Sequence, residues 1–250
     1  MIRGIYAAAS SLLSLLHRQE ALSHNLANMN TPGFKQEVVL PQRGTTWALV
    51  QDWGRAGQSP PIGGLTYTVE RGNTEIDYRQ GPLENTQRPL DLAIVGDGFF
   101  RVQTPKGVRL TRDGTFHRDS AGHLVTSDGY FLLGENGPLQ IGEGDPYIAA
   151  DGSIYMPGAT TPVGRIALGR VADLTALRPQ GDNLWDPGDA PVEVMPPAQT
   201  TIRQGFIEQA NVDVSGTVVS MMLALRSYEA TQRTLRLQDE ALQRVLDIGR

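Results

Sequence analysis

Both ends of the chain repeat apolar residues at helical spacing, and this pattern limits the fold more than any other feature of the sequence. At the amino end the residues of one stripe follow each other at steps of three and four: Ile2, Ile5, Ala9, Leu12, Leu16, Gln19, Ser23 and Leu26. At the carboxyl end no proline occurs between Val214 and Gly249, so roughly 35 residues can form one helix of about 50 Å. We therefore expect one long helix at each end.

The carboxyl-terminal segment carries a similar stripe. Its members are Val218, Met221, Leu225, Tyr228, Gln232, Leu235 and Leu242, with Met222, Val245 and Leu246 beside them. Asp213 precedes the stripe and is expected to cap the helix. The two stripes can cover each other by pairing as a coiled coil. Either this pair closes one compact domain, or its surplus apolar surface contacts other copies of the chain.

The region between the two helices has the composition of a β domain. The 250 residues include 28 glycines and 16 prolines, and from about residue 72 to residue 198 Asp-Gly pairs precede short aromatic or branched runs. We expect these pairs, which begin at Asp97, Asp113, Asp128 and Asp151, to form hairpin turns because glycine readily adopts positive φ angles. The sequence thus predicts an α+β fold, with terminal helices paired as a coiled coil and a central β domain of hairpins.

Four segments follow from these patterns. They are an amino-terminal helix and its end (1–35), an extended arm (36–71), the β domain (72–198) and a carboxyl-terminal segment with its helix (199–250). The arm has no clear period. Because it contains Trp47, Trp53 and Tyr67, which are costly to leave in water, we expect it to become ordered against a partner. A flexible connection is the alternative, and Pro196–Gln199 forms a smaller hinge.

Charge and hydropathy exclude several classes of partner. The formal net charge is only −5 and the basic residues are scattered, which argues against nucleic acid and against insertion into a membrane. No run of 18 apolar residues occurs. Residues 7–16 resemble the apolar part of a signal peptide, but the helical pattern continues beyond them, so we expect no cleavage. Lys35 and Lys106 are the only lysines, which we attribute to base composition.

No pattern of a catalytic or metal site stands out. Asp113, Asp119 and Asp128 lack the spacing of a calcium loop, and His117 and His123 lack a third ligand for zinc. The sequence contains no cysteine, P-loop or G-x-S-x-G motif. We therefore expect no enzyme activity and no cofactor. A hydrolase that uses carboxylates of the β domain would need an acidic cleft.

Five separated motifs resemble those of the bacterial flagellar axial proteins, the rod and hook family. They are NLAN with TPGFK in residues 25–35, PLDLAI with GDGFF in 89–100, LTRDGTF in 110–116, GFIEQANVD in 205–213 and ALRSYEA in 224–230. The resemblance covers nearly the whole chain. It implies a structural subunit of the basal-body rod, in a helical tube with paired terminal helices inside and β domains outside. Tyr228-Glu229 favours the distal rod type and Pro162–Ile166 the proximal type.

The resemblance also implies partners and a location. The partners are other copies of the chain, other flagellar rod and hook proteins, and the flagellar export apparatus. The location is the periplasm-spanning rod, reached by export without cleavage. We expect the following residues to carry assembly: Ile5, Leu12, Leu16, Asn25, Leu26, Asn28, Pro32, Gly33, Phe34, Asn211, Val218, Met222, Leu225, Tyr228, Leu235 and Leu242.

The break after the first helix has a physical basis in its residues. Asn25 and Asn28 can bind backbone groups where the helix ends. Pro32 lacks an amide donor, Gly33 permits an unusual φ angle, and Phe34 offers an apolar plug. We expect this turn to direct the chain into the arm while the hairpins of the β domain form independently of it. The alternative function is a secreted β-rich adhesin or carbohydrate-binding module that its terminal helices oligomerise.

Overall fold

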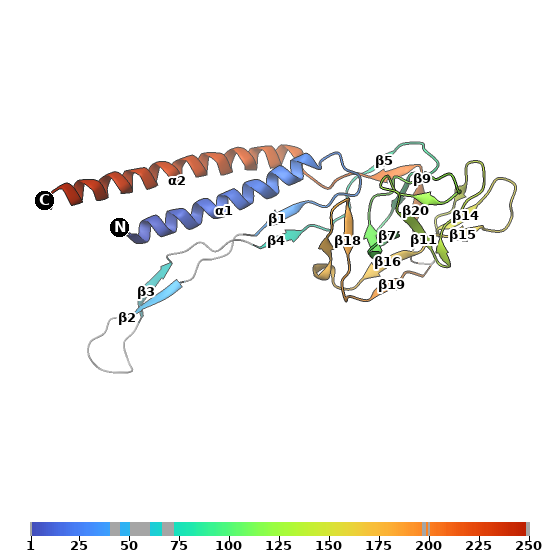
Figure 1. Ribbon diagram of the computed structural model, residues 1–250, viewed down its shortest axis with the longest axis horizontal. Coiled ribbons are helices and arrows are strands. Elements are labelled where there is room, and N and C mark those ends of the chain that lie inside the picture. Colours follow the sequence, from blue (N-terminus) through green and yellow to red (C-terminus); the bar gives the residue numbers. More distant parts are fainter. Residues whose placement is uncertain are drawn as a thin grey trace. The chain divides into compact units, whose positions relative to one another are not determined.

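The computed structural model has an α+β fold, with one long helix at each end of the chain and many short strands between them (Figure 1). It describes residues 2–40, 46–50, 61–66, 73–196, 199 and 201–248, with the backbone alone at 2–6, 46–50, 61–66, 242 and 245–248. The chain divides into two compact units. The first comprises Met1–Ala27, Glu37–Glu75 and Asp213–Arg250, and the second comprises Asn28–Gln36 and Ile76–Val212.

The two helices belong to the first unit and contact each other. Helix α1 (Ile2–Ala27) and helix α2 (Val214–Ile248) run antiparallel (Figure 1). Asp213 caps α2 as predicted, because its Oδ1 accepts a hydrogen bond from the amide of Gly216 at 3.1 Å. Neither α1 nor α2, within its described residues, combines the length and the apolar character needed to cross a membrane.

The first unit also contains two short β ribbons. Strand β1 (Glu37–Val39) pairs with β4 (Thr74–Ile76), and α1 contacts β1. Strands β2 (Thr46–Val50) and β3 (Pro61–Thr66) form an antiparallel hairpin with a register shift between Leu49 and Val50. The arm of residues 36–71 therefore contains strands. Trp53 and Tyr67, on which the expected contact with a partner rests, lie outside the described residues, as do Pro197 and Ala198 of the hinge.

The second unit is built on a ten-stranded sheet. Its main path has the order β17-β18-β8-β7-β11-β10-β9, and β12, β16 and β19 join at its side. These strands are β7 (Phe99–Thr104), β8 (Gly107–Thr111), β9 (His117–Arg118), β10 (Leu124–Val125), β11 (Phe131–Gly134), β12 (Gly137–Pro138), β16 (Leu168–Val171), β17 (Arg178–Pro179), β18 (Leu184–Asp186) and β19 (Val192–Val194), with a 3₁₀ turn at Leu174–Ala176.

Smaller sheets complete the second unit. Strands β13 (Tyr147–Ile148), β14 (Ser153–Tyr155) and β15 (Gly164–Arg165) form one of three strands. The chain on either side of the large sheet then meets in two antiparallel pairs: β20 (Ile202–Gln204) with β6 (Leu92–Ile94), and β21 (Phe206–Glu208) with β5 (Leu83–Asn85). The segment just before α2 thus closes onto strands from the start of the β region.

Strand β7 separates two apolar cores, since successive side chains of a strand point to opposite faces. Phe100 enters the larger core, where its ring meets that of Phe116 edge to face at 5.1 Å. Phe99 enters the smaller core beside Leu110 and Trp185. The double aromatic that follows Gly98 therefore supplies both cores.

The expected Asp-Gly hairpin turns are confirmed at two of four positions. Gly129 and Gly152 both have φ of 84° and lie in the turns of the β10–β11 and β13–β14 hairpins. The expectation is wrong at Asp97, which lies between β6 and β7, two strands that do not pair with each other. It is also wrong at Gly114, because the flanking strands β8 and β9 do not pair with each other. Gly114 instead packs against the Leu92 backbone so closely that a Cβ would come within 1.6 Å of the Leu92 oxygen.

Candidate assembly site

The turn after α1 is held by backbone contacts within the second unit. Gly33 has a φ of +71°, and an added Cβ would lie 2.4 Å from the carbonyl carbon of Arg112, so only glycine fits without displacement. The Gly33 amide donates to the Glu208 carbonyl oxygen at 2.7 Å. The Pro32 oxygen accepts from Nδ2 of Asn183 at 2.5 Å. The turn is therefore built into the β structure.

Phe34 and the residues before it complete this turn. The Phe34 side chain is buried, and its amide donates to the Thr31 oxygen at 3.2 Å. The Thr31 amide donates to the Asn28 carbonyl oxygen at 3.0 Å, and the Thr31 hydroxyl to Oδ1 of Asn28 at 3.3 Å. Two successive tight turns thus connect Asn28 to Phe34.

The next residue, Lys35, enters a buried ion cluster with Glu208 and Arg112. Lys35 and Glu208 are each 1% exposed and Arg112 is 5% exposed. Nζ of Lys35 lies 2.6 Å from Oε1 of Glu208, and Nη1 of Arg112 lies 3.1 Å from Oε2. Nζ also donates to the Arg79 oxygen at 2.8 Å, and Nη2 donates to the Gly96 oxygen at 2.7 Å.

The cluster contains two cationic groups and one anionic group. Burial lowers the pKa of Lys35, and the attraction of Glu208 opposes this shift. Burial likewise lowers the pKa of Arg112, again against the attraction of Glu208. Because burying a charge is costly unless the charge is paired, Glu208 is the residue on which both cations depend.

Asn211 connects the same turn to the segment that follows β4. Its Oδ1 accepts from the Gln36 amide at 2.8 Å, and its Nδ2 donates to the Asp77 and Arg79 oxygens at 2.7 and 3.0 Å. The Asp77 carboxylate accepts from Nε2 of Gln36 at 3.1 Å. Hydrogen bonds from Arg79 are the main cause that lowers the pKa of Asp77 to about 2.

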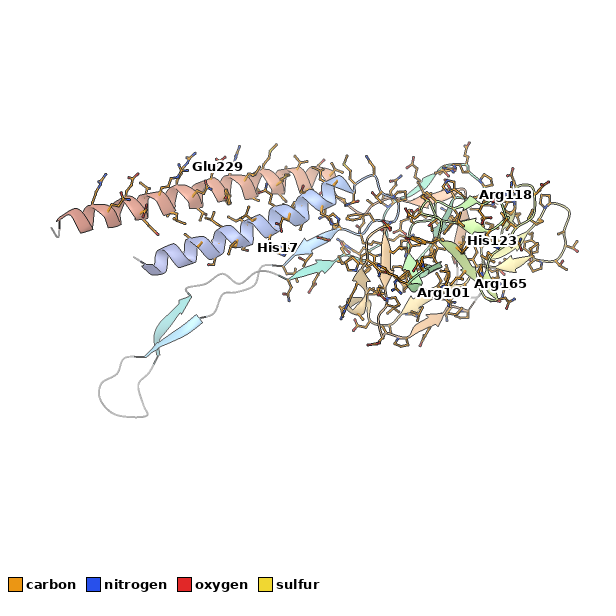
Figure 2. The ribbon with its side chains drawn as sticks, viewed as in Figure 1. His17, Arg101, Arg118, His123, Arg165 and Glu229 are labelled. Atoms are coloured by element: carbon orange, nitrogen blue, oxygen red, sulfur yellow. The ribbon has the colours of Figure 1, made fainter. Side chains whose placement is uncertain are left out.

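In the first unit, Asn25 joins α1 to β1. Its Nδ2 donates to the Glu37 carbonyl oxygen and its Oδ1 accepts from the Glu37 amide, each at 2.8 Å. The side chain thereby pairs with both backbone groups of one strand residue, as a neighbouring strand would. His24 Nδ1 lies 3.0 Å from Oε1 of Glu37. His17 (Figure 2) makes a 3.0 Å hydrogen-bond contact with Thr74 of β4.

The apolar face of α1 is only partly covered in the single chain. Leu12 and Leu26 are half-buried, and Leu16 is exposed. The neighbouring Leu13 is 68% exposed. For Ile5, which we also expected to carry assembly, the structure describes the backbone alone.

The stripe of α2 likewise contains both half-buried and exposed residues. Val218, Tyr228 and Leu235 are half-buried, while Leu225 is 39% exposed and Met222 is 57% exposed. The residue buried at this level is Ala224. Glu229, on the face of α2 away from α1 (Figure 2), is solvated. The Leu242 side chain lies outside the description.

Three residues of the site were not singled out in the sequence. Lys35, Arg112 and Glu208 lie in the TPGFK, LTRDGTF and GFIEQANVD motifs, but the scarcity of lysine was attributed to base composition. Each of them is followed by a polar residue, namely Gln36, Asp113 and Gln209, so no local pattern marked these charges as buried. No other clear chemistry emerges: the described residues contain no group of three or more His, Asp or Glu side chains placed to hold a metal ion.

Three family profiles match the chain, and each contains one residue of the ion cluster. The family described as "Flagella basal body rod protein" matches residues 5–35, the "Flagellar hook protein FlgE/F/G D1 domain" matches 93–164, and the "Flagellar basal body rod FlgEFG protein C-terminal" matches 203–248. The class defined by the fold and the site is therefore that of the flagellar axial proteins.

Among the flagellar axial proteins, the chain is similar to curated proteins of the basal-body rod. The chain is 29% identical to the flagellar basal-body rod protein FlgG of Bacillus subtilis (strain 168) over the full length of both. It is 31% identical to FlgG of Buchnera aphidicola subsp. Schizaphis graminum over 98% of this chain and 99% of the relative. It is also 31% identical to the flagellar basal-body rod protein FlgF of Rhizobium meliloti (strain 1021) over 99% and 98%.

The chain belongs to the family of flagellar basal-body rod proteins. It is accordingly a structural subunit of the rod in the flagellar basal body, and not an enzyme. None of these relatives supports the alternative of a secreted adhesin or carbohydrate-binding module.

Proposed function

We propose that copies of this chain polymerise into a helical drive shaft that transmits torque and encloses the export channel. The observation that carries the proposal is the apolar surface that the helix pair leaves exposed, at Leu13, Leu16, Met222, Leu223 and Leu237. Large apolar side chains that gather on one element of a soluble protein mark an interaction surface. In the polymer α1 and α2 pair as a coiled coil in an inner layer, and neighbouring copies cover the remaining apolar surface.

The segments have different roles in this proposal. Residues 1–35 and 199–250 supply the inner layer, residues 36–71 form an arm that is ordered by a neighbour, and residues 72–198 form the outer β domain. The named rod and hook relatives support assembly with other rod and hook proteins. The chain passes through the flagellar export apparatus without cleavage and takes its place in the periplasm-spanning part of the rod.

The contacts around the turn suit a subunit that must repeat its geometry in every copy. Asn25 fixes α1 to β1 within the first unit, and the Lys35–Glu208–Arg112 cluster fixes the turn within the second. A buried, hydrogen-bonded cluster allows few arrangements, so it specifies one conformation of the turn. The assembly role of Asn28, Pro32, Gly33, Phe34 and Asn211 is therefore to hold the turn in shape.

Electron microscopy of the concentrated purified protein tests the proposal. We expect tubes or helical fragments from the natural chain, and their loss in Leu13→Gln, which removes an exposed apolar side chain without touching the ion cluster. Arg233→Gln, at an exposed position of α2, is the control and should assemble normally. Discrete trimers at every concentration would favour an adhesin-like oligomer and contradict the proposal.

A further inference from the structure

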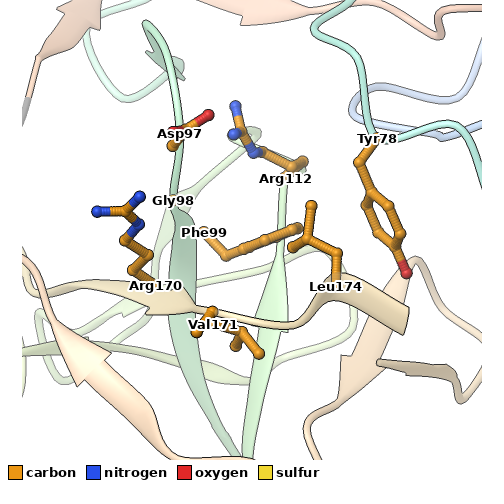
Figure 3. A pocket seen from close by; sticks show the side chains of 9 residues that line it. Tyr78, Asp97, Gly98, Phe99, Arg112, Arg170, Val171 and Leu174 are labelled. Carbon is orange, nitrogen blue, oxygen red and sulfur yellow. The ribbon is translucent and has the colours of Figure 1, made fainter. Parts of the chain in front are cut away.

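The second unit contains a small cavity next to the ion cluster. Its volume is about 160 Å³, and it is lined by Tyr78, Asp97, Gly98, Phe99, Arg112, Arg170, Val171, Ala172 and Leu174. Figure 3 shows the guanidinium groups of Arg112 and Arg170 beside the segment of Asp97 and Gly98, with apolar side chains below them. The cavity therefore combines a cationic rim with an apolar floor.

Arg112 lines this cavity and carries a buried donor without a partner. Its Nη1 binds Glu208 and its Nη2 binds the Gly96 oxygen, but its Nε has no hydrogen-bond partner among the described residues. The guanidinium carbon lies 5.2 Å from the centre of the Phe99 ring. A buried donor without a partner costs free energy, and a ligand that accepts its hydrogen bond relieves this cost.

The charges point to an anion. Lys35 and Arg112 share the single carboxylate of Glu208, so the cluster behind the cavity carries one surplus positive charge. Arg170 adds a second, since it is exposed and has no ion-pair partner within the described part of the chain. Asp97 attracts Arg112 at longer range but forms no ion pair with it in the described structure. The three positive groups, Lys35, Arg112 and Arg170, thus face two negative ones, Glu208 and Asp97, and one positive charge is left without a negative counterpart.

We infer that this cavity binds a carboxylate group on a short apolar stem, with the carboxylate at Arg112 and Arg170 and the stem against Phe99, Val171 and Leu174. A cavity of about 150 Å³ is large enough for benzene, so the volume suits a group of this size. Two sources offer this chemistry: a free small carboxylate, or an Asp or Glu side chain of a neighbouring subunit. The second source rests on the assembly proposed above.

Titration of the dilute full-length protein with propionate, followed by amide NMR signals, tests the binding site without requiring assembly. We expect saturable shifts at Gly98, Phe99 and Val171 with propionate and none with propionamide, its uncharged counterpart. Arg170→Gln should weaken the binding about fivefold, whereas Arg178→Gln, at an exposed position on β17 away from the cavity lining, should leave it unchanged. Asp97→Asn should strengthen binding, because it removes the competing negative charge.

Equal responses to propionate and propionamide, or no response to either, would overturn the inference. So would unchanged affinity in both Arg170→Gln and Asp97→Asn. Incorporation into the rod in cells distinguishes the two sources of the carboxylate. If a neighbouring subunit supplies it, Arg170→Glu lowers incorporation into the rod and Arg178→Glu does not. Normal incorporation of Arg170→Glu, combined with its loss of propionate binding, assigns the site to a free carboxylate.

Discussion

At the scale of single residues, Glu208 holds the turn and its surroundings through four separate contacts. Its carboxylate binds Lys35 and Arg112, Oε1 also accepts from the Gly81 amide at 3.0 Å, and its backbone oxygen accepts from Gly33. The loss of Lys35 and the loss of Glu208 would leave different charges behind. Without Lys35 the cluster is a neutral pair, and without Glu208 it is two buried positive charges.

We therefore predict unequal effects from the two neutralising substitutions. Glu208→Gln should destabilise the second unit by about 3–5 kcal/mol, the usual cost of leaving a buried charge without its partner. Lys35→Met should cost about 1–2 kcal/mol, since Arg112 still compensates Glu208. Urea denaturation followed by the amide NMR signals of β7 and β8 measures both. An equal loss in the two variants would contradict the charge balance that we assign to the cluster.

Asp77 gives the same region an acid dependence. Its folded-state pKa of about 2 lies below the ordinary value of 3.8, so the unfolded chain takes up this proton first as the pH falls. The stability that Asp77 contributes is present above about pH 4 and is lost as the pH falls towards about 2. In Asp77→Asn, stability should fall less steeply over this range than in the natural chain. Asp145→Asn, in an exposed loop, serves as the control. If stability falls equally steeply with pH in Asp77→Asn and in the natural chain, Asp77 is not the source of this acid dependence.

At the scale of elements, local patterns identified the helices but not the packing of the turn. Apolar periodicity and the absence of proline predicted α1 and α2, and Asp213 predicted the cap, because these signals lie within a few residues of one another. The cluster joins Lys35 to a residue 173 positions away, and such a pairing leaves no period in the sequence. Residues 28–36 belong to the second unit, so the turn packs with the β structure. That the hairpins of the β domain form independently of this turn stays a prediction.

Gly33 allows a direct test of that packing. Gly33→Ala adds a Cβ 2.4 Å from the Arg112 backbone at a φ of +71°, whereas Gly129→Ala adds one at a φ of +84° with no atom within 4 Å. Both variants carry the conformational cost of about 1–2 kcal/mol, but only Gly33→Ala also displaces a neighbouring segment. We predict a clearly larger loss of second-unit stability for Gly33→Ala by urea denaturation. Equal losses would mean that the turn packs loosely.

At the scale of the whole molecule, the exposed faces of the helices connect the single chain to the polymer. Leu225 is 39% exposed, beside the buried Ala224. Replacing a packed leucine by alanine costs about 2–5 kcal/mol, but little of that cost arises where the side chain is still partly in water. We predict that Leu225→Ala leaves the melting of the dilute protein nearly unchanged and impairs incorporation into the rod.

Arg233→Ala, with a 79% exposed side chain, is the control for Leu225→Ala and should do much less to assembly. Fractionation of basal bodies measures incorporation, and thermal melting of the dilute protein measures the single chain. Cooperative unfolding of the dilute Leu225→Ala protein would place this side chain in a self-contained core, and its role in assembly would then be excluded.

The most direct test of the account is electron microscopy of basal bodies isolated from cells that lack this chain. Because the chain is a structural rod subunit, we predict incomplete rods in these cells, and complete rods when the natural chain is supplied again. Leu13→Gln should fail to restore the rod although the protein is produced, while Arg233→Gln should restore it. Complete rods in cells without the chain would contradict the central claim.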